Sequence, residues 1–502
     1  MTSSTSLKDS WAELARAIEG LASTGRMDVR ENGEWLADLS PARCELQHNG
    51  KNMLVHLWSE QRNLTRRILA LAELSENRIV LEIQRFGQAR PGKLELLLPE
   101  SQRPPARLAR EQFRAALRRM LAERFPDAEI ESSTTARDLE HSFSDVYVRG
   151  RMREGARVWA FLAASASESA AAIEGMLTFG LLWLEHLRNR AAARPIEGLR
   201  LFVPEGSSHG LLRRLAVLSS PTRTAVFEIS PDGGEIHAAS PDGAGNFESR
   251  VISRRETDAA IAAASDALAK VCMLVPEAGN AIQPRAVSPR EVEFCFRGLR
   301  FARWVLGRGL IFGLGEKEQP LSDDSEPAFE RLIRKLELHR SPLAEVTSHP
   351  LYRGYPERWL ETLICEDPTR LDAHLDPRFI YSQIPAVAGH DQRVLDLLAV
   401  TLQGRLVVIE VKASENIHLP MQALDYWLRA RSHHFAGDFK RLGYFPGIEL
   451  SPDPPLVWLV APALRFHPSI EIVLKYLSSD VRVTRIGVNE TWRRGIKVVF
   501  RK

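Results

Sequence analysis

The first hundred residues alternate apolar and polar positions in short runs separated by turn-forming residues. This period-two alternation, bounded by Asn, Gly and Pro, is typical of antiparallel strands with one buried face. The runs are Cys44–His48, Met53–Trp58, Ile68–Leu74, Ile79–Phe86 and Leu94–Leu98. A helix is expected ahead of them, over about residues 7–22. We therefore predict an N-terminal domain over residues 1–104, made of a helix and an antiparallel β-sheet.

The pattern changes after Pro104-Pro105, where helical and strand periods begin to alternate. Apolar positions spaced three and four apart predict a helix that opens at Pro104-Pro105, with Phe113, Leu117, Met120 and Leu121 as its apolar stripe. A long apolar helix is expected near residues 167–189. Strands are expected over Asp145–Arg149, Val158–Ala163 and Leu199–Val203. Such alternation is typical of α/β domains. We predict an α/β domain over residues 105–250, a helix and β-rich connector over 251–350, and a further domain over 351–502.

Composition agrees with an α/β multidomain protein. At about 150 residues per domain, 502 residues suggest roughly three domains. With 44% hydrophobic and 26% charged residues, the chain is neither collagen-like nor broadly disordered. Its four cysteines form no CxxC motif, which excludes the common zinc and redox motifs of that spacing. No apolar run is long enough to span a bilayer and no signal peptide fits, so we expect a soluble, cytoplasmic protein.

The net charge of +3 is too small to indicate a nucleic-acid partner, but the charge is unevenly distributed. Arg103–Arg124 has seven basic and two acidic residues, and Val481–Lys502 has seven basic and one acidic. Phosphate contacts need such local positive stripes, although a solvated surface would give the same pattern. Near the C-terminus, the candidates for phosphate contact are Arg493, Arg494, Lys497 and Arg501.

Residues 393–412 carry the pattern most informative about function. Two apolar runs flank Gln403-Gly404, which predicts a tight β-hairpin. Asp396 interrupts the first run, whereas Glu410 and Lys412, two residues apart at the end of the second, share one face of their strand. Charged groups in such runs are costly to bury unless they pair with each other or hold a metal ion. The hairpin can bring Asp396 beside Glu410, which would place two carboxylates and one lysine together.

This grouping suits the hydrolysis of phosphodiester bonds. Two carboxylates are suitable hard oxygen ligands for Mg²⁺ or Mn²⁺. The metal ion lowers the pKa of a bound water and neutralises charge that grows on the phosphate. Lys412 would orient the water or stabilise the developing anion. Downstream, Gln422 and Tyr426 lie at positions i and i+4 of an expected helix and therefore on one face. Upstream, Glu361 lies in another expected helix, from which it could reach the metal ion through water.

These residues resemble a known family. Asp396 followed by Glu410-Val-Lys412 resembles the signature of the PD-(D/E)xK nuclease superfamily. Gln422-Ala-Leu-Asp-Tyr426 resembles the QxxxY motif of its RecB-like branch. The run that begins at Leu360-Glu361, with residues 395–400, is similar to the C-terminal domain of NucS-type mismatch endonucleases. The resemblance covers roughly residues 350–490, under a third of the chain.

The resemblance implies a restriction-endonuclease-like core of order αβββαβ and a metal-dependent DNA endonuclease of repair or defence. Its site residues are expected in three roles. The metal ion would be served by Asp396, Glu410 and Glu361, the last as the helix-borne acid. Lys412 would be catalytic. The site would be supported, or nucleic acid contacted, by Gln422 and Tyr426. The expected cofactor is Mg²⁺ or Mn²⁺ and the expected partner is DNA. The resemblance also implies that the N-terminal sheet either joins two chains as a homodimer or grips the duplex.

The middle of the chain contains a weaker echo of the same pattern. When residues 157–164 are aligned with residues 405–412, Leu162 takes the place of Glu410 and Ala164 that of Lys412. Asp145 is then expected near the place of Asp396. We interpret this segment as a degenerate second copy of the nuclease-like domain, which cannot bind metal because Leu and Ala have no ligand atoms. The alternative is that the two α/β segments are unrelated and only share a similar pattern of apolar and polar residues.

Two other functions are compatible with the sequence. Gly206-Ser-Ser208-His-Gly210 fits the G-x-S-x-G pattern between an expected strand and helix, so a serine hydrolase with Ser208 as nucleophile is one alternative. The other is a catalytically inactive DNA-binding or assembly protein, in which Asp396, Glu410 and Lys412 form only a buried ion pair. Retention of the nuclease fold does not by itself imply activity.

Overall fold

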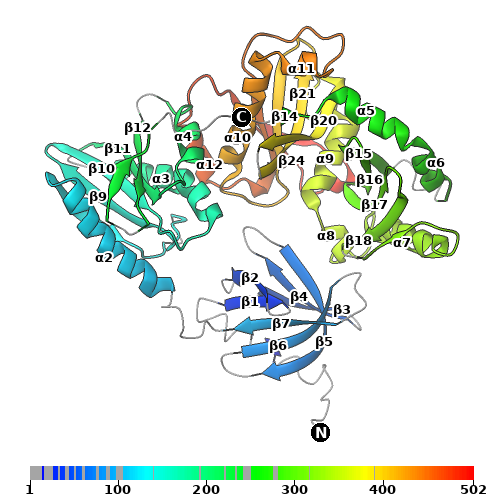
Figure 1. Cartoon of the computed structure of the whole chain (residues 1–502), viewed down its shortest axis with the longest axis horizontal. Helices are drawn as coiled ribbons and strands as arrows, with labels where there is room; N and C mark the ends of the chain where they lie inside the picture. Colours follow the sequence, from blue (N-terminus) through cyan, green and yellow to red (C-terminus); the bar gives the residue numbers. More distant parts are fainter. Residues whose placement is uncertain are drawn as a thin grey trace. The chain divides into compact units, whose positions relative to one another are not determined.

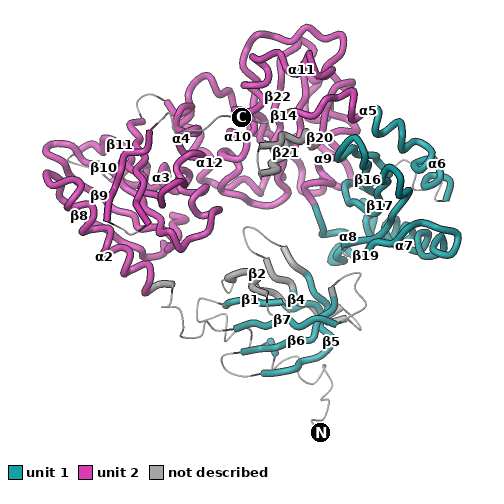
Figure 2. The backbone as a smooth tube through the Cα atoms, viewed as in Figure 1, with its two compact units in different colours: residues 1–105, 259–355 teal, residues 106–258, 356–502 magenta. Residues whose placement is uncertain are grey.

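The computed structural model describes the greater part of the chain. The described residues are 14–15, 18, 27–31, 34–39, 44–49, 52–58, 63–74, 78–85, 91–97, 106–138, 141–190, 194–219, 222–231, 234–240, 250–274, 281–315, 317–388 and 391–502. They form two compact units, one of residues 1–105 and 259–355, the other of residues 106–258 and 356–502 (Figure 2). The units are therefore interleaved along the sequence.

The first unit begins with a seven-stranded antiparallel sheet, which confirms the predicted antiparallel N-terminal sheet (Figure 1). Its strands, in spatial order, are β2 (Glu34–Leu39), β1 (Met27–Glu31), β7 (Gly92–Leu97), β6 (Arg78–Arg85), β5 (Asn63–Leu74), β4 (Asn52–Trp58) and β3 (Cys44–Asn49). Val55, Ile68 and Leu81 are buried on one face, as period-two alternation requires. Most of the helix expected over residues 7–22 lies outside the described residues.

The second part of this unit is an antiparallel meander packed against helices. Its strands follow chain order as β15 (Ile282–Ser288), β16 (Glu291–Phe296), β17 (Leu299–Val305), β18 (Gly309–Leu314) and β19 (Lys317–Pro320). Its helices are α6 (Ser265–Leu274), α7 (Glu326–His339) and α8 (Pro350–Arg353), and α5 (Arg254–Ala263) crosses the boundary between the units. Phe294 and Phe301 of the sheet share a core with Phe329 and Ile333 of α7.

Arg340 ties the end of α7 to this meander. Its side chain is fully buried. The guanidinium donates hydrogen bonds to the carbonyl oxygens of Phe296, Arg297, Leu351, Gly354 and Tyr355. Because a guanidinium has five N–H donors in a rigid plane, one side chain can satisfy this many acceptors at once. Residues 340–355 are thus held by the first unit.

The second unit contains two α/β halves. The first half runs α2 (Ala106–Arg124), β8 (Ala128–Thr134), β9 (Val148–Glu154), β10 (Arg157–Ala163), α3 (Ala170–Arg190), β11 (Ile196–Pro204), α4 (His209–Leu215), β12 (Arg223–Ile229) and β13 (Ile236–Ala238). Strands β8 to β10 form an antiparallel meander, and β10, β11 and β12 are parallel. The expectation that Asp145 begins a strand is wrong, because β9 begins at Val148.

Within the described part of the chain, no helix, apolar α3 included, is long and apolar enough to cross a membrane.

The second half repeats this arrangement. It runs α9 (Pro356–Glu366), β20 (Leu375–Ala388), β21 (Asp391–Thr401), β22 (Leu406–Val411), α10 (Leu419–Phe435), α11 (Asp438–Arg441), β23 (Leu456–Pro462), α12 (Ser469–Leu474), β24 (Val483–Val488) and β25 (Val498–Arg501). Strands β20 to β22 are antiparallel, and β22, β23 and β24 are parallel. A short strand from earlier in the chain, β14 (Arg250–Val251), pairs with β20.

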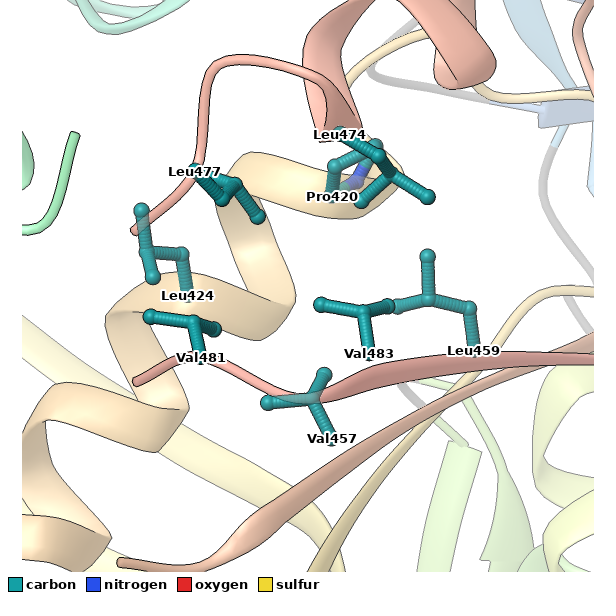
Figure 3. A pocket seen from close by; sticks show the side chains of 8 residues that line it. All are labelled: Pro420, Leu424, Val457, Leu459, Leu474, Leu477, Val481 and Val483. Atoms are coloured by element: carbon teal, nitrogen blue, oxygen red, sulfur yellow. The ribbon is translucent and has the colours of Figure 1, made fainter. Parts of the chain in front are cut away.

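The core of the second half lies between the sheet and helices α10 and α12. Figure 3 shows the apolar side chains that surround a small gap there, which are Pro420, Leu424, Val457, Leu459, Leu474, Leu477, Val481 and Val483. Every described side chain that lines this gap is apolar. The gap is therefore part of the hydrophobic core.

Candidate active site

The predicted hairpin positions two carboxylates on one face of the last sheet. Strands β21 and β22 pair with Leu397 opposite Ile409, so the next step of the register places Asp396 opposite Glu410. Residues directly opposite each other in an antiparallel pair have their side chains on the same face. Asp396 Oδ2 also accepts a hydrogen bond from the backbone N–H of Val411 at 3.3 Å. The two acidic side chains therefore meet where β22 ends.

Glu410 is buried at the end of a strand whose six residues are all buried. Its side chain is only 1% exposed, and Oε1 accepts a hydrogen bond from Lys412 Nζ at 2.8 Å. The other carboxyl oxygen, Oε2, is buried and has no hydrogen-bond partner among the described residues. A buried acceptor without a partner costs about 1–3 kcal/mol, so this oxygen favours a ligand that would bind it.

The electrostatics of the three charged groups are coupled. Burial raises the pKa of Glu410 well above its usual value; the Lys412 ammonium opposes this shift and Asp396 adds to it. Burial alone would lower the pKa of Lys412, but the carboxylates of Glu410 and Asp396 outweigh burial and raise it above its usual value. Lys412 is therefore a cation at neutral pH and acts through its charge.

Helix α10 brings Tyr426 to the same group. Burial raises the pKa of the Tyr426 phenol, and the nearby carboxylates of Glu410 and Asp396 raise it further, so the phenol is neutral and can donate a hydrogen bond. Gln422 lies one turn before Tyr426 on the same face of α10. Its Oε1 is a second buried oxygen that lacks a hydrogen-bond partner within the described part of the chain.

Helix α9 also approaches the end of β22, through an acid outside the predicted site. Glu357 Oε1 accepts a hydrogen bond from the backbone N–H of Ala413, the residue after Lys412, at 3.4 Å. Glu361, one turn later, is buried and its Oε2 accepts from Arg358 at 3.1 Å. The i, i+4 spacing of these two glutamates was the available signal.

The donor set fits a hard divalent cation. Asp396 and Glu410 supply carboxylate oxygens on one face, and the unpartnered Glu410 Oε2 is an acceptor of the kind Mg²⁺ binds. One lysine offsets only one of the two negative charges. No three His, Cys, Asp or Glu side chains among the described residues are grouped closely enough to hold a metal ion by themselves. A third ligand would therefore be water or substrate, and the role of Glu361 at the metal ion stays a prediction.

The basic residues near the C-terminus differ in their surroundings. Arg493 lies over the rings of Trp359 and Trp492, at 5.2 and 4.2 Å from their centroids. Arg501 pairs with Asp372. Arg494 and Lys497, in contrast, are exposed, and both lie near β25. These two are the better candidates for phosphate contact.

The serine of the G-x-S-x-G pattern is placed differently from a nucleophile. Ser208 is buried before α4, and its backbone N–H donates to Glu228 Oε1 at 3.1 Å. A nucleophile elbow presents its serine on an exposed turn beside a histidine base. The side chain that accepts a hydrogen bond from the backbone of Ser208 is the carboxylate of Glu228, and this environment favours a structural role for the serine.

Comparisons with known proteins add little to this geometry. No family model and no curated protein matches the chain. Among the solved structures that match, a repair endonuclease from Pyrococcus abyssi aligns with 46% of this chain and 98% of its own at 12% identity and a TM-score of 0.17. At that TM-score the likeness does not indicate a function, and the site residues are what indicates one.

Proposed function

We propose that the chain is a metal-dependent nuclease that hydrolyses phosphodiester bonds of DNA. The observation that carries the proposal is the meeting of Asp396, Glu410 and Lys412 at the end of β22, where one buried Glu410 oxygen has no hydrogen-bond partner among the residues that the structure describes. Two neighbouring carboxylates, one of which has an oxygen free to accept a ligand, suit a divalent cation. A fixed ammonium group beside them suits an anionic substrate.

In this function each residue has one task. Asp396 and Glu410 hold Mg²⁺ or Mn²⁺, which when bound activates water and offsets charge on the phosphate. Lys412 places its positive charge where negative charge develops on the phosphate oxygens. Tyr426 and Gln422 support the site from α10, and Glu361 assists from α9 through water.

Two further observations support the proposal. The order of elements after residue 355 is a helix, three antiparallel strands, a helix and a parallel strand, as the resemblance to PD-(D/E)xK nucleases implies. The motif residues on β21, β22 and α10 are also those that approach one another. A role in DNA repair or defence follows from the same resemblance, as does the use of the N-terminal sheet to join two chains or to grip DNA.

Removing the metal ion tests this proposal directly. Labelled duplex, mismatched, branched and single-stranded DNA is incubated with the full chain in Mg²⁺, Mn²⁺ or EDTA. We expect cleavage of at least one substrate with either metal ion and none in EDTA. Glu410→Ala should abolish cleavage, whereas Glu449→Ala, at an exposed position, should not. Binding without cleavage under all conditions would instead favour the inactive DNA-binding protein, for which the direct Glu410–Lys412 ion pair is the supporting observation.

Contact of DNA with the C-terminal strand has its own signature. If Arg494 and Lys497 contact phosphates, the double variant Arg494→Ala/Lys497→Ala should weaken binding to all sequences alike. The slope of log affinity against log salt concentration should fall by about two, one for each lost contact. Fluorescence anisotropy over a salt series measures this slope. An unchanged slope would assign both residues to the ordinary solvated surface.

A further inference from the structure

The two halves of the second unit follow one plan from end to end. Each has a helix, an antiparallel three-stranded meander, a crossover helix, a parallel strand, a second crossover helix, another parallel strand and a final antiparallel strand. Within the described parts of the chain, the second half adds only α11, three short 3₁₀ turns and the strand β14. Corresponding positions can therefore be read from the strand register, independently of sequence similarity.

The register identifies the counterpart of Glu410. In the second half Glu410 pairs with Leu459 of the neighbouring parallel strand, three residues before Pro462. In the first half Leu162 pairs with Leu201, three residues before Pro204. Leu162 thus occupies the place of Glu410.

The next contact along the strand identifies the counterpart of Lys412. The backbone N–H of Lys412 donates to the carbonyl oxygen of Val460 at 2.9 Å. In the first half the backbone N–H of Ala164 donates to the carbonyl oxygen of Phe202 at 3.0 Å. Ala164, with no charged group, therefore stands where the other half has its lysine.

The counterpart of Asp396 is a basic residue. Arg149 of β9 pairs directly with Leu162, just as Asp396 lies opposite Glu410. Asp145, which the sequence analysis placed near this position, precedes the strand and forms an ion pair with Arg110. The first half therefore offers Arg, Leu and Ala where the second offers Asp, Glu and Lys.

Arg149 is built firmly into this position. It is buried, and its guanidinium donates to the carbonyl oxygens of Ser144, at 3.2 Å, and Ala136. The same group lies over the rings of Phe143 and Trp183. A fixed cation at this place, without a carboxylate opposite it, repels a metal ion.

The two halves also pack as a symmetric dimer would. The backbone N–H of Ser219 donates to the carbonyl oxygen of Tyr476 at 2.8 Å, and that of Ser478 donates to Val217 at 2.9 Å. Leu218 and Leu477 form the antiparallel bridge between these two bonds. Each pair of partners exchanges equivalent contacts, which is the mark of an isologous, two-fold interface.

The helices follow the same reciprocity. Helix α3 of the first half contacts α12 of the second, and α10 of the second contacts α4 of the first. One hydrophobic core, which includes Leu181, Leu424 and Val473, extends across both halves. On one side of the interface Arg214 pairs with Asp425 through both carboxylate oxygens, at 2.8 and 2.6 Å. The unit is thus a pseudo-dimer within one chain.

We propose that this pseudo-dimer is a nicking enzyme, which cuts one strand of duplex DNA in each binding event. This inference rests on the proposed nuclease function. The two strands of a duplex are related by two-fold symmetry, and a symmetric dimer acts on both because it presents one site to each. Here the half that would serve the second strand has no carboxylate or lysine at the reacting position. Its remaining task is to bind and orient the duplex for the site at Glu410.

A supercoiled plasmid distinguishes one cut from two. A nick converts it to an open circle, whereas paired cuts convert it to linear DNA, and a gel separates the three forms. The full chain is used in molar excess over plasmid, with Mg²⁺ present. We expect almost all of the plasmid to become open circles before linear DNA appears. In a single-turnover experiment on a duplex with a different fluorophore on each strand, one of the two strands should be cut in each binding event. Glu449→Ala, at an exposed position, should nick at the wild-type rate. Lys412→Ala should nick about 10²–10³-fold more slowly.

The outcomes separate the inference from the function it rests on. Linear DNA that forms without an open-circle intermediate would overturn the nicking inference while leaving the nuclease function intact. A rate of linear product that rises with the square of the protein concentration would also overturn it, because two chains would then be cutting together. If neither plasmid nor any labelled substrate is cut with either metal ion, the nuclease function fails and the inference fails with it.

Discussion

Replacing Lys412 by alanine is expected to lower the rate of metal-dependent DNA cleavage by about 10²–10³-fold, as loss of one preorganised charged donor commonly does. The ammonium group lies 2.8 Å from Glu410 Oε1, and its pKa is raised, so it carries a positive charge at neutral pH. Alanine removes that charge from the place where the phosphate gains negative charge. Single-turnover cleavage with the best substrate of the panel measures the loss.

Two companion variants make this result specific. Lys412→Arg keeps the charge but changes its shape, and should retain more activity than Lys412→Ala. Lys440→Ala removes an exposed lysine of α11 and should leave the rate unchanged. Circular dichroism should show the same secondary structure in all variants, because Glu410 can take up a proton when its cation is lost. Equal rates for Lys412→Ala and wild type would contradict the proposed role of Lys412.

The main parts of the site could be predicted because they depend on short-range geometry. The residues between Asp396 and Lys412 form a single hairpin, so the alternation of side chains and the turn at Gly404 place the two acids and the lysine together. The spacing of Gln422 and Tyr426 is likewise set within one helix. Each of these relations follows from the period of a strand or a helix.

Glu357 was missed because its contact depends on packing. Its hydrogen bond to the backbone of Ala413 joins residues 56 positions apart, and no local period sets where α9 lies against the end of β22. The sequence indicated only that Glu357 and Glu361 lie on one face of a helix. Which of them points toward the strand is decided by the packing of the helix on the sheet.

Several of the strands that were misplaced or missed carry charged residues. In β9, Arg151 and Arg153 alternate with buried residues and pair across the strands with Glu131 and Glu129 of β8. Because these ion-paired residues occupy positions where apolar residues would mark a strand, the hydrophobic pattern does not indicate β8 and β9 clearly. Strands β1 and β2 are rich in acidic residues and were not predicted either. The pairing of β1 with β7 is a long-range contact that no local pattern encodes.

Arg340 illustrates the same limit at a position where the expected effect is large. Proline and glycine residues recur over residues 340–356, a pattern that favours a linker. Arg340 is nevertheless fully buried and bonds to five backbone carbonyl oxygens. Arg340→Met keeps a long apolar stem but leaves these acceptors without their donor. Each buried acceptor left unsatisfied costs about 1–3 kcal/mol. We expect the local free energy of unfolding to fall by at least about 3 kcal/mol.

Hydrogen exchange measured by mass spectrometry tests this locally, which suits a chain with several domains that need not unfold in one transition. Amides of β16 and β17 should exchange at least about 100-fold faster in Arg340→Met, since about 1.4 kcal/mol corresponds to a factor of ten. Arg334→Met is the matched control, because Arg334 lies on α7 and its side chain is 76% exposed. A surface ion pair contributes at most about 1 kcal/mol, so the control should change exchange little. Equal exchange in the two variants would mean that the carbonyl oxygens find water or other donors, and that Arg340 does not hold residues 340–355 to the meander.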